Sequence, residues 1–326
     1  MIYIYVFQQI SMGRPLHELV KELSTNSKRG EIIMKKFFKT SGFILLYLAI
    51  YFILQLVYLI GAMVVSMVST MSNNPDIDQS ALINHTVTRI NNHILPAIIV
   101  AAIISFGIYY LICRGRKTTI FKVCEFNRIS LQKVALMIPA AISLGFVVGF
   151  LISKVYSLGI LDEAFSTHQD LMGDIMGGST IMTFLAVGLM GPFIEEVIFR
   201  GLIYKELRGS LSIIPALIIQ AVLFGLYHMQ VIQAIYSVFI GIAFGLVFIW
   251  FKSIWAPVIL HVVYNSTFVV LSRIPEGSFI DQYPNLVFII NLVILITSFI
   301  FLYKERIVEV EDAEEPTITN DNILEV

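Results

Sequence analysis

Long apolar runs are the feature that most constrains how this chain can fold. Residues 43–68, 94–113 and 134–152 are comparable in length to the roughly 20 residues that a helix needs to cross a bilayer. Only 14% of the residues are charged, against about 25% in a typical soluble domain, and the mean hydropathy is +0.83. This composition argues against an ordinary soluble domain and predicts a polytopic membrane protein.

The apolar runs predict helices and not membrane strands. Strands of a membrane barrel are shorter and alternate between apolar and polar side chains, which these runs do not do. We therefore expect an all-α fold, a membrane helical bundle of about eight transmembrane helices. The predicted spans are 42–68, 93–113, 134–153, 179–204, 212–229, 232–251, 255–272 and 284–303.

The basic residues are distributed unequally between alternate connecting segments. Of the 22 Lys and Arg residues, only Arg89, Lys154 and Arg273 fall in segments on one side of the predicted spans. The remaining ones lie in the segments on the other side. Because cytoplasmic segments carry the excess of Lys and Arg, this pattern places both termini in the cytosol. We expect a multi-pass protein of a plasma membrane, and the composition suggests a bacterial one.

The two ends of the chain differ from its apolar middle. Residues 1–33 are either a mis-assigned start, with Met34 as the true one, or a short amphipathic cytosolic stretch. The acidic carboxyl tail is expected to be disordered. The predicted segments are a cytosolic amino-terminal segment (1–40), two spans with a basic loop (41–130), a membrane domain (131–303) and the tail (304–326).

Polar residues outside the spans have simple interpretations. Cys113 and Cys124 fall on or near the predicted cytosolic side and show neither a disulfide framework nor a metal-binding pattern. His168, in the glycine-containing segment 154–178, has carboxylates nearby that could bind a metal with it. We favour ordinary exterior polar residues, and we expect that segment to be irregular or partly re-entrant.

Charged residues inside a span cost about 2.5–3.5 kcal/mol each to insert, so those in the fourth span need a reason. Glu196 and Arg200 are four residues apart on one helical face, in the favourable order for an ion pair. Glu195 is rotated by about 100 degrees from that face, and an apolar setting without a close cation suits a general base. We predict that Glu196 and Arg200 hold the helix and that Glu195 takes part in chemistry. The alternative is that all three residues form a salt-bridged polar cluster that only holds helices together.

Two further spans carry groups that can work with Glu195. His228 ends the fifth span, and His261 and Asn265 lie four residues apart on one face of the seventh. A lone histidine in a membrane helix is often only an interhelical contact. Here three separate spans each carry a polar or ionisable group of this kind, and this distribution fits a shared polar site better than isolated contacts. No serine or cysteine has an evident base partner and no His-Glu-x-x-His zinc helix is present, so the residues favour hydrolysis by an activated water.

Three motifs in order make a specific resemblance. They are Glu195-Glu196-x-x-x-Arg200 with Phe199 and Gly201, Phe224-x-x-x-His228, and His261-x-x-x-Asn265. Together they resemble the motifs of the CAAX-protease and bacteriocin-processing family, also called Abi, which includes the type II CAAX prenyl endopeptidases. The resemblance covers roughly residues 130–275.

The resemblance implies an intramembrane cavity open to the cytosol and a role for each motif residue. Glu195 would be the water-activating base, His228 its partner, and His261 and Asn265 the stabilisers of the oxyanion. Glu196, Arg200 and Phe224 would be supporting residues. Relatives are described either as metalloproteases or as glutamate-dependent proteases. Glu195, His228 and His261 are acceptable ligands for one divalent metal such as zinc, and we prefer the metal-free chemistry.

One feature of the predicted spans conflicts with a shared site. If every span is straight, Glu195 lies nearer the cytosolic face and His228 nearer the outer face, with a difference in depth approaching 10 Å at about 1.5 Å per residue. Two explanations are open. Either the fourth span continues through Arg208, or the fifth span starts late and tilts.

The leading function is an endopeptidase that cuts a membrane-associated or lipid-modified peptide. In a bacterium, a peptide pheromone, a bacteriocin precursor or a signal-peptide remnant is a more plausible substrate than a prenylated protein. The alternative is a non-proteolytic scaffold for bacteriocin immunity or for a sensor system. A transporter that uses Glu195 as a proton relay is a weaker third, because no repeats are evident. Membrane lipids and a peptide are the expected partners, and nucleic acid is not.

Overall fold

The computed structural model describes residues 16–275 and 277–307, and all the regular elements within them are helices. This confirms the predicted all-α class. Residues 308–326, which hold most of the predicted acidic tail, lie outside the described part of the chain, as do residues 1–15 of the proposed amino-terminal extension.

The helices follow one another with short connections. The long ones are α2 (Leu16–Asn73), α3 (Gln79–Gly115), α5 (Leu131–Tyr156), α6 (Asp162–Gly177), α10 (Ile213–Tyr227), α11 (Val231–Phe251), α12 (Trp255–Leu271) and α14 (Pro284–Lys304). The short ones are α4 (Ile120–Val123) and α13 (Phe279–Gln282). Between α6 and α10, one continuous helix is built of α7 (Thr180–Thr183), η1 (Phe184–Met190), α8 (Gly191–Glu196), η2 (Val197–Ile203) and α9 (Tyr204–Arg208), of which η1 and η2 are π-helical.

The eight predicted spans all fall on helices, but the helices differ in length from the prediction. Six of those described are long and apolar enough to cross a membrane, whereas α10 and α12 have only 15 and 17 residues. A count of eight full spans is therefore not established by length. Helix α2, by contrast, is longer than predicted: its 58 residues begin at Leu16, well ahead of the predicted span 42–68.

The segment expected to be irregular is in fact a helix. Helix α6 covers Asp162–Gly177, and Asp162 and Glu163 occupy its first turn, where carboxylates stabilise the positive end of a helix dipole. The glycines at positions 173 and 177 lie within this helix, and the local sequence therefore misled the prediction. Phe165 is buried, and α6 contacts α3 and α11.

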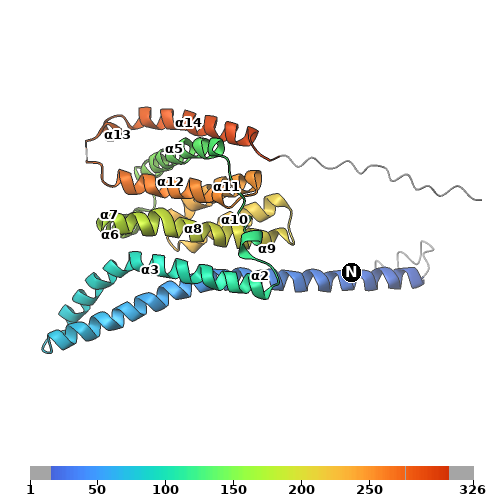
Figure 1. The fold of residues 1–326 in the computed structure, drawn as a ribbon, viewed down its shortest axis with the longest axis horizontal. Helices are drawn as coiled ribbons and strands as arrows, with labels where there is room; N and C mark the ends of the chain where they lie inside the picture. Colours follow the sequence, from blue (N-terminus) through green and yellow to red (C-terminus); the bar gives the residue numbers. More distant parts are fainter. Residues whose placement is uncertain (1–15, 276, 308–326) are drawn as a thin grey trace, which may run out of the picture.

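The helices pack in layers, as Figure 1 shows. The α2–α3 hairpin forms one side, the helix containing α8 lies next to it, and α12, α5 and α14 follow in that order. One buried apolar cluster joins the hairpin to the middle of the bundle and contains Tyr47, Ala101, Ile198 and Ala216. The first two helices thus share a core with the segment that carries the charged motif.

Helices α10 and α11 approach closely because glycines lie where they meet. A β-carbon at Gly225 would be 2.6 Å from the carbonyl oxygen of Ala234 and 2.6 Å from Val238 Cγ2. One at Gly241 would be 3.1 Å from the α-carbon of Ala221. Backbone atoms cannot retreat as a flexible side chain can, so these positions require glycine.

The substitution Gly225→Ala is expected to lower the free energy of unfolding by about 1–3 kcal/mol, the usual cost of overpacking a well-packed interior. The measurement is the thermal or denaturant unfolding midpoint of the purified protein in detergent. Gly107→Ala in α3 is the matched control, since a β-carbon there meets nothing within 4 Å and alanine favours a helix interior. Equal stability of both variants would contradict the close packing.

Candidate functional site

A cavity of about 630 Å³ lies within the bundle, and residues from nine helical elements line it. Glu195 of α8, His228 at the end of α10, and His261 and Asn265 of α12 all reach it. The structure therefore brings the four predicted site residues to one place. Tyr51 and Ile98 of the α2–α3 hairpin also line it, so the first two helices help to form the cavity.

The expected difference in depth disappears because the fourth span continues beyond its predicted end. The helix runs on to Arg208, and α10 begins at Ile213 after a short turn. At about 1.5 Å per residue, Glu195 lies about 20 Å and His228 about 22 Å from that turn. The long helix that ends at Arg208 and the short α10 thus place Glu195 and His228 at a similar depth in the bundle.

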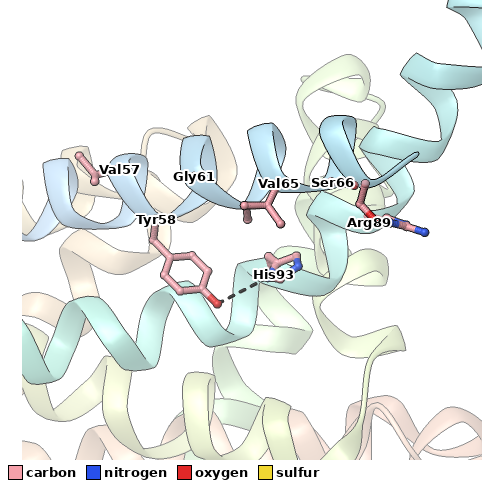
Figure 2. Close-up of a pocket in the computed structure, with 9 residues that line it drawn as sticks. Val57, Tyr58, Gly61, Val65, Ser66, Arg89 and His93 are labelled. Atoms are coloured by element: carbon pink, nitrogen blue, oxygen red, sulfur yellow. Dashed lines mark hydrogen bonds between the residues drawn. The ribbon is translucent and has the colours of Figure 1, made fainter. Parts of the chain in front are cut away.

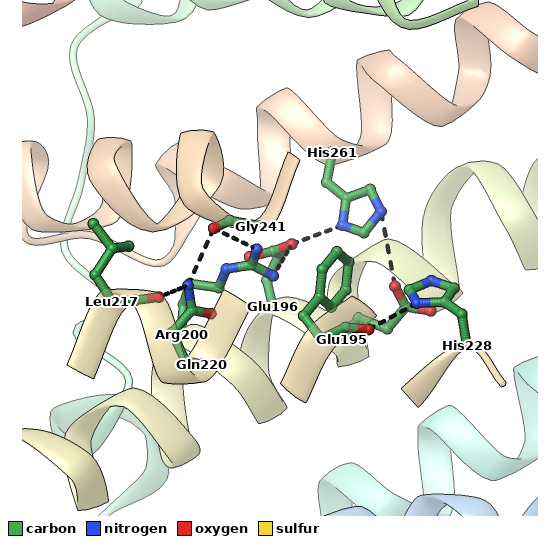
Figure 3. A network of polar contacts seen from close by, with 9 residues as sticks. Glu195, Glu196, Arg200, Leu217, Gln220, His228, Gly241 and His261 are labelled. Atoms are coloured by element: carbon green, nitrogen blue, oxygen red, sulfur yellow. Dashed lines mark hydrogen bonds and ion pairs between the residues drawn. The ribbon is translucent and has the colours of Figure 1, made fainter. Parts of the chain in front are cut away.

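A chain of buried polar contacts runs from Arg200 to His261 (Figure 3). Arg200 Nη1 lies 2.9 Å from Glu196 Oε1, and neither side chain is exposed. Arg200 Nη2 donates to the carbonyl oxygen of Gly241 at 3.1 Å, which ties this helix to α11. Glu196 Oε1 also lies 2.7 Å from His261 Nδ1. The predicted ion pair is confirmed, and the structure adds that Glu196 orients His261.

Glu195 differs from its neighbour in both exposure and partners. Its side chain is 19% exposed, whereas that of Glu196 is fully buried. Its carboxylate lies 3.8 Å from His261 Nε2, and no Lys or Arg of the described residues forms an ion pair with it. Glu195 is therefore the carboxylate that faces the cavity, and Glu196 is held by two partners behind it.

The backbone fixes the tautomer of His228. Its Nδ1 lies 2.8 Å from the carbonyl oxygen of Phe224, which can only accept a hydrogen bond. In a neutral ring Nδ1 then carries the proton, and Nε2 remains an acceptor. The Phe224 ring also packs edge-on against the rings of His228 and His261, at 4.9 and 5.9 Å between centroids. Phe224 thereby supports both histidines.

The side-chain amide of Asn265 has an N–H group that no hydrogen bond to a described residue uses. Its Nδ2 donates to the carbonyl oxygen of Val187 at 2.9 Å, and a side-chain amide has two N–H groups. Val187 belongs to the π-helical stretch η1, which ends directly before Gly191 and Pro192. Proline cannot donate an α-helical hydrogen bond, and π-helical turns inside helices are frequent at functional sites.

Sequence reasoning did not identify the tyrosines around the cavity. Tyr51, Tyr227, Tyr236 and Tyr264 line it, and the hydroxyls of Tyr227 and Tyr264 are buried with no hydrogen-bond partner. Tyr227 directly precedes His228 and Tyr264 directly precedes Asn265, and this adjacency in the sequence could have identified them. Their hydroxyls can donate to a group that enters the cavity.

His168 also belongs to the cavity, where the sequence suggested an ordinary exterior residue. It lies on α6 with Leu171, Met172, Ile175 and Met176, and these positions form one helical stripe that lines the cavity. Its Nδ1 lies 3.0 Å from Gln230 Oε1, a residue of the turn before α11. The spacing i, i+3, i+4, i+7 and i+8 is present in the sequence, but the sequence does not show which surface of the protein these side chains face.

The resemblance implied a cavity that opens toward the cytosol. The lining of the cavity in the structure includes residues of α6, and Figure 1 shows α6 at the end of the bundle away from α9. In Figure 1 this is the end where α6, α7 and α13 gather. The side of the membrane that this end faces is not fixed by the helices themselves, and an opening toward the cytosol stays a prediction.

The three candidate metal ligands do not form a metal site in this arrangement. No group of three His, Cys, Asp or Glu side chains in the described part of the chain is placed to hold a metal ion. The Nδ1 atoms of His228 and His261 contact the Phe224 carbonyl oxygen and the Glu196 carboxylate, contacts that also orient metal-binding histidines. Glu195, His228 and His261 are not gathered around one metal position as arranged, and we derive no step through a metal.

Comparison with known proteins finds relatives of the segment that holds these residues. The model of the family "Type II CAAX prenyl endopeptidase Rce1-like" matches residues 177–267. The chain is 27% identical over 129 residues to the "putative membrane peptidase YdiL" of Bacillus subtilis (strain 168), an alignment that covers 40% of this chain and 52% of that protein. It is 29% identical over 100 residues to the membrane-embedded CAAX protease MroQ of Staphylococcus aureus (strain USA300), covering 28% and 40%.

These matches are partial. The chain spans about half the length, or less, of the two curated relatives that it matches. The family match lies inside the region 130–275 that the motifs indicated, and it contains all five motif residues that line the cavity. No solved structure matches the chain.

Proposed function

We propose, from the membership of residues 177–267 in the CAAX-protease family, that this protein is an intramembrane endopeptidase that uses a water activated by Glu195. The observation that supports this most is the separation of roles between two adjacent carboxylates. Glu196 is buried against Arg200 and His261, and Glu195 faces the cavity beside His228 and Asn265. A scaffold has no need of a free carboxylate at that position.

Each residue contributes a distinct step to the proposed reaction. The Glu195 carboxylate removes a proton from a water whose oxygen attacks the carbonyl carbon of the scissile peptide bond. His228, with Nδ1 donating to Phe224, accepts a hydrogen bond from that water through Nε2. The proton held by Glu195 then passes to the departing amine as the carbon–nitrogen bond breaks.

The oxyanion formed in this step needs donors that are already in place. Asn265 has an N–H beyond the one used by Val187. His261 is held with Nε2 toward the cavity by its contact with Glu196, and Nε2 donates when both ring nitrogens carry a proton. Prearranged donors of this kind are worth about 2.7–4 kcal/mol each in known hydrolases. Glu196 and Arg200 act through His261, and we assign them positioning roles.

The lining of the cavity indicates the substrate class. The α6 stripe presents Leu171, Met172, Ile175 and Met176, and methionine side chains adapt to irregular apolar partners. Most of the other lining residues are aromatic or aliphatic. We therefore propose an apolar, membrane-associated peptide or a lipid-modified one, cut within the bundle.

Cleavage of a library of membrane peptides by the purified protein tests the proposal. We expect products with the wild type and none with Glu195→Ala or His228→Ala. The same assay with a chelator distinguishes metal-dependent from glutamate-dependent hydrolysis. We expect cleavage to persist when the chelator is present. Identical profiles for wild type and variants, with support of resistance or signalling in cells retained, would establish the scaffold function instead.

A further inference from the structure

A second pocket lies between α2 and α3, away from the cavity described above, and has a volume of about 510 Å³ (Figure 2). Its lining residues come from both helices of the hairpin. They are Val57, Tyr58, Gly61, Ala62, Val65, Ser66, Ser69, Arg89 and His93. None of them belongs to the motifs or to the proposed catalytic site, so the inference below does not depend on the proposed function.

Arg89 and Ser66 lie at one end of the pocket, and Val57 with Tyr58 lies at the other (Figure 2). Arg89 comes just before the predicted span 93–113, and Ser66 lies near the end of the predicted span 42–68. Both therefore fall at the expected boundary between headgroups and hydrocarbon. Val57 and Gly61 lie deeper along α2, and Val57 and Val65 are exposed. This order of groups matches an amphiphile that stands upright in the bilayer.

The polar end lacks a partner for its cation. No described residue forms a hydrogen bond or an ion pair with Arg89, whose guanidinium offers five N–H donors. Ser66 Oγ is buried and has no hydrogen-bond partner either. Tyr58 Oη lies 3.5 Å from His93 Nδ1 on the opposite helix, and this contact joins the two helices near Gly61 (Figure 2). Arg89 is exposed, and its guanidinium can bind an anionic group that accepts hydrogen bonds.

We propose that this groove binds an anionic phospholipid, with its phosphodiester on Arg89 and one acyl chain along Gly61 between Val57 and Val65. Guanidinium groups suit phosphate oxygens, and basic pockets between membrane helices are known to hold lipid headgroups. A free phosphate ion would leave the apolar part of the groove unused. Glycine at position 61 keeps this part open, because a β-carbon there meets nothing within 4 Å.

Native mass spectrometry of the full-length protein, delipidated and incubated with phosphatidylglycerol or phosphatidylcholine, tests the proposal. We expect preferential retention of phosphatidylglycerol by the wild type. Arg89→Gln is expected to reduce it about fivefold, which corresponds to about 1 kcal/mol for one basic group at a membrane surface. Arg89→Lys should retain most of it. Lys154→Gln is the matched control, since Lys154 is another of the three bases on the same predicted side but does not line the groove.

A second variant tests the acyl chain separately from the charge. Gly61→Leu places a branched side chain in the groove. A β-carbon at this position meets nothing within 4 Å, and leucine improves helix propensity, so the fold is expected to persist. It should reduce phosphatidylglycerol retention although Arg89 is intact. Wild-type retention by Gly61→Leu or by Arg89→Gln would overturn the proposal. Displacement of the lipid by millimolar inorganic phosphate would also overturn it, because the site would then be one for a free anion.

Discussion

The substitution Glu195→Gln is expected to reduce the rate of peptide cleavage by about 10²–10⁴-fold, the usual contribution of a general base. Glutamine keeps the size of the side chain and its hydrogen-bonding capacity but cannot take a proton from water. Because Glu195 is partly exposed to the cavity and pairs with no Lys or Arg among the described residues, the fold does not need its charge. The measurement is kcat and KM on a peptide found in the library screen, together with the unfolding midpoint.

Two comparisons make this result interpretable. Glu305→Gln, at an exposed carboxylate just after α14, should leave both cleavage and stability unchanged. Glu196→Gln should reduce stability as well as activity, since Glu196 is buried against Arg200 and His261. If Glu195→Gln stayed active and Glu196→Gln lost activity at unchanged stability, the base would have to be reassigned to Glu196.

Removal of the Arg200 side chain is expected to have the largest effect on stability. Arg200→Ala leaves the Glu196 carboxylate buried without its cation, and breaking a buried pair in this way costs about 3–5 kcal/mol. It also removes the hydrogen bond to Gly241 and the contact with the Phe224 ring, whose centroid lies 4.4 Å from the guanidinium carbon. Denaturant unfolding in detergent and the rate of proteolysis measure the loss.

A double variant separates the lost charge from the lost volume. Glu196→Gln combined with Arg200→Met removes both charges and keeps much of the volume, so it should recover a large part of the lost stability. Arg208→Ala is the matched control, because Arg208 is exposed and donates to the carbonyl oxygen of Leu211 in the following turn. A loss for Arg200→Ala no greater than for Arg208→Ala would contradict the structural role of the buried pair.

Much of the fold and part of the site could be predicted because they depend on short stretches of sequence. Hydropathy is a local property, and the apolar runs therefore indicated the helices. The ion pair of Glu196 and Arg200 followed from a spacing of four on one helix. The three ordered motifs indicated the family that the comparison with known proteins also finds. The helical state of 162–177 was missed, because glycines and polar residues there suggested an irregular segment.

Contacts between helices could not be predicted in the same way, because they depend on the height and rotation of each helix in the bundle. The bond between Glu196 and His261 joins residues 65 positions apart. The meeting of Glu195 with His228 required the fourth helix to run on to Arg208 and α10 to be short. No spacing in the sequence specifies either relation.

The sequence by itself determined that this protein is a helical membrane protein, which residues are polar within it, and which family its motifs resemble. Only the tertiary structure decided that Glu196 contacts His261, that Glu195 and His228 line the same cavity, and that α6 with His168 forms one wall of it. The physical reason is packing. Close approach at glycines such as Gly225 and a continuous helix from Thr180 to Arg208 set the helix positions, and those positions select which side chains meet.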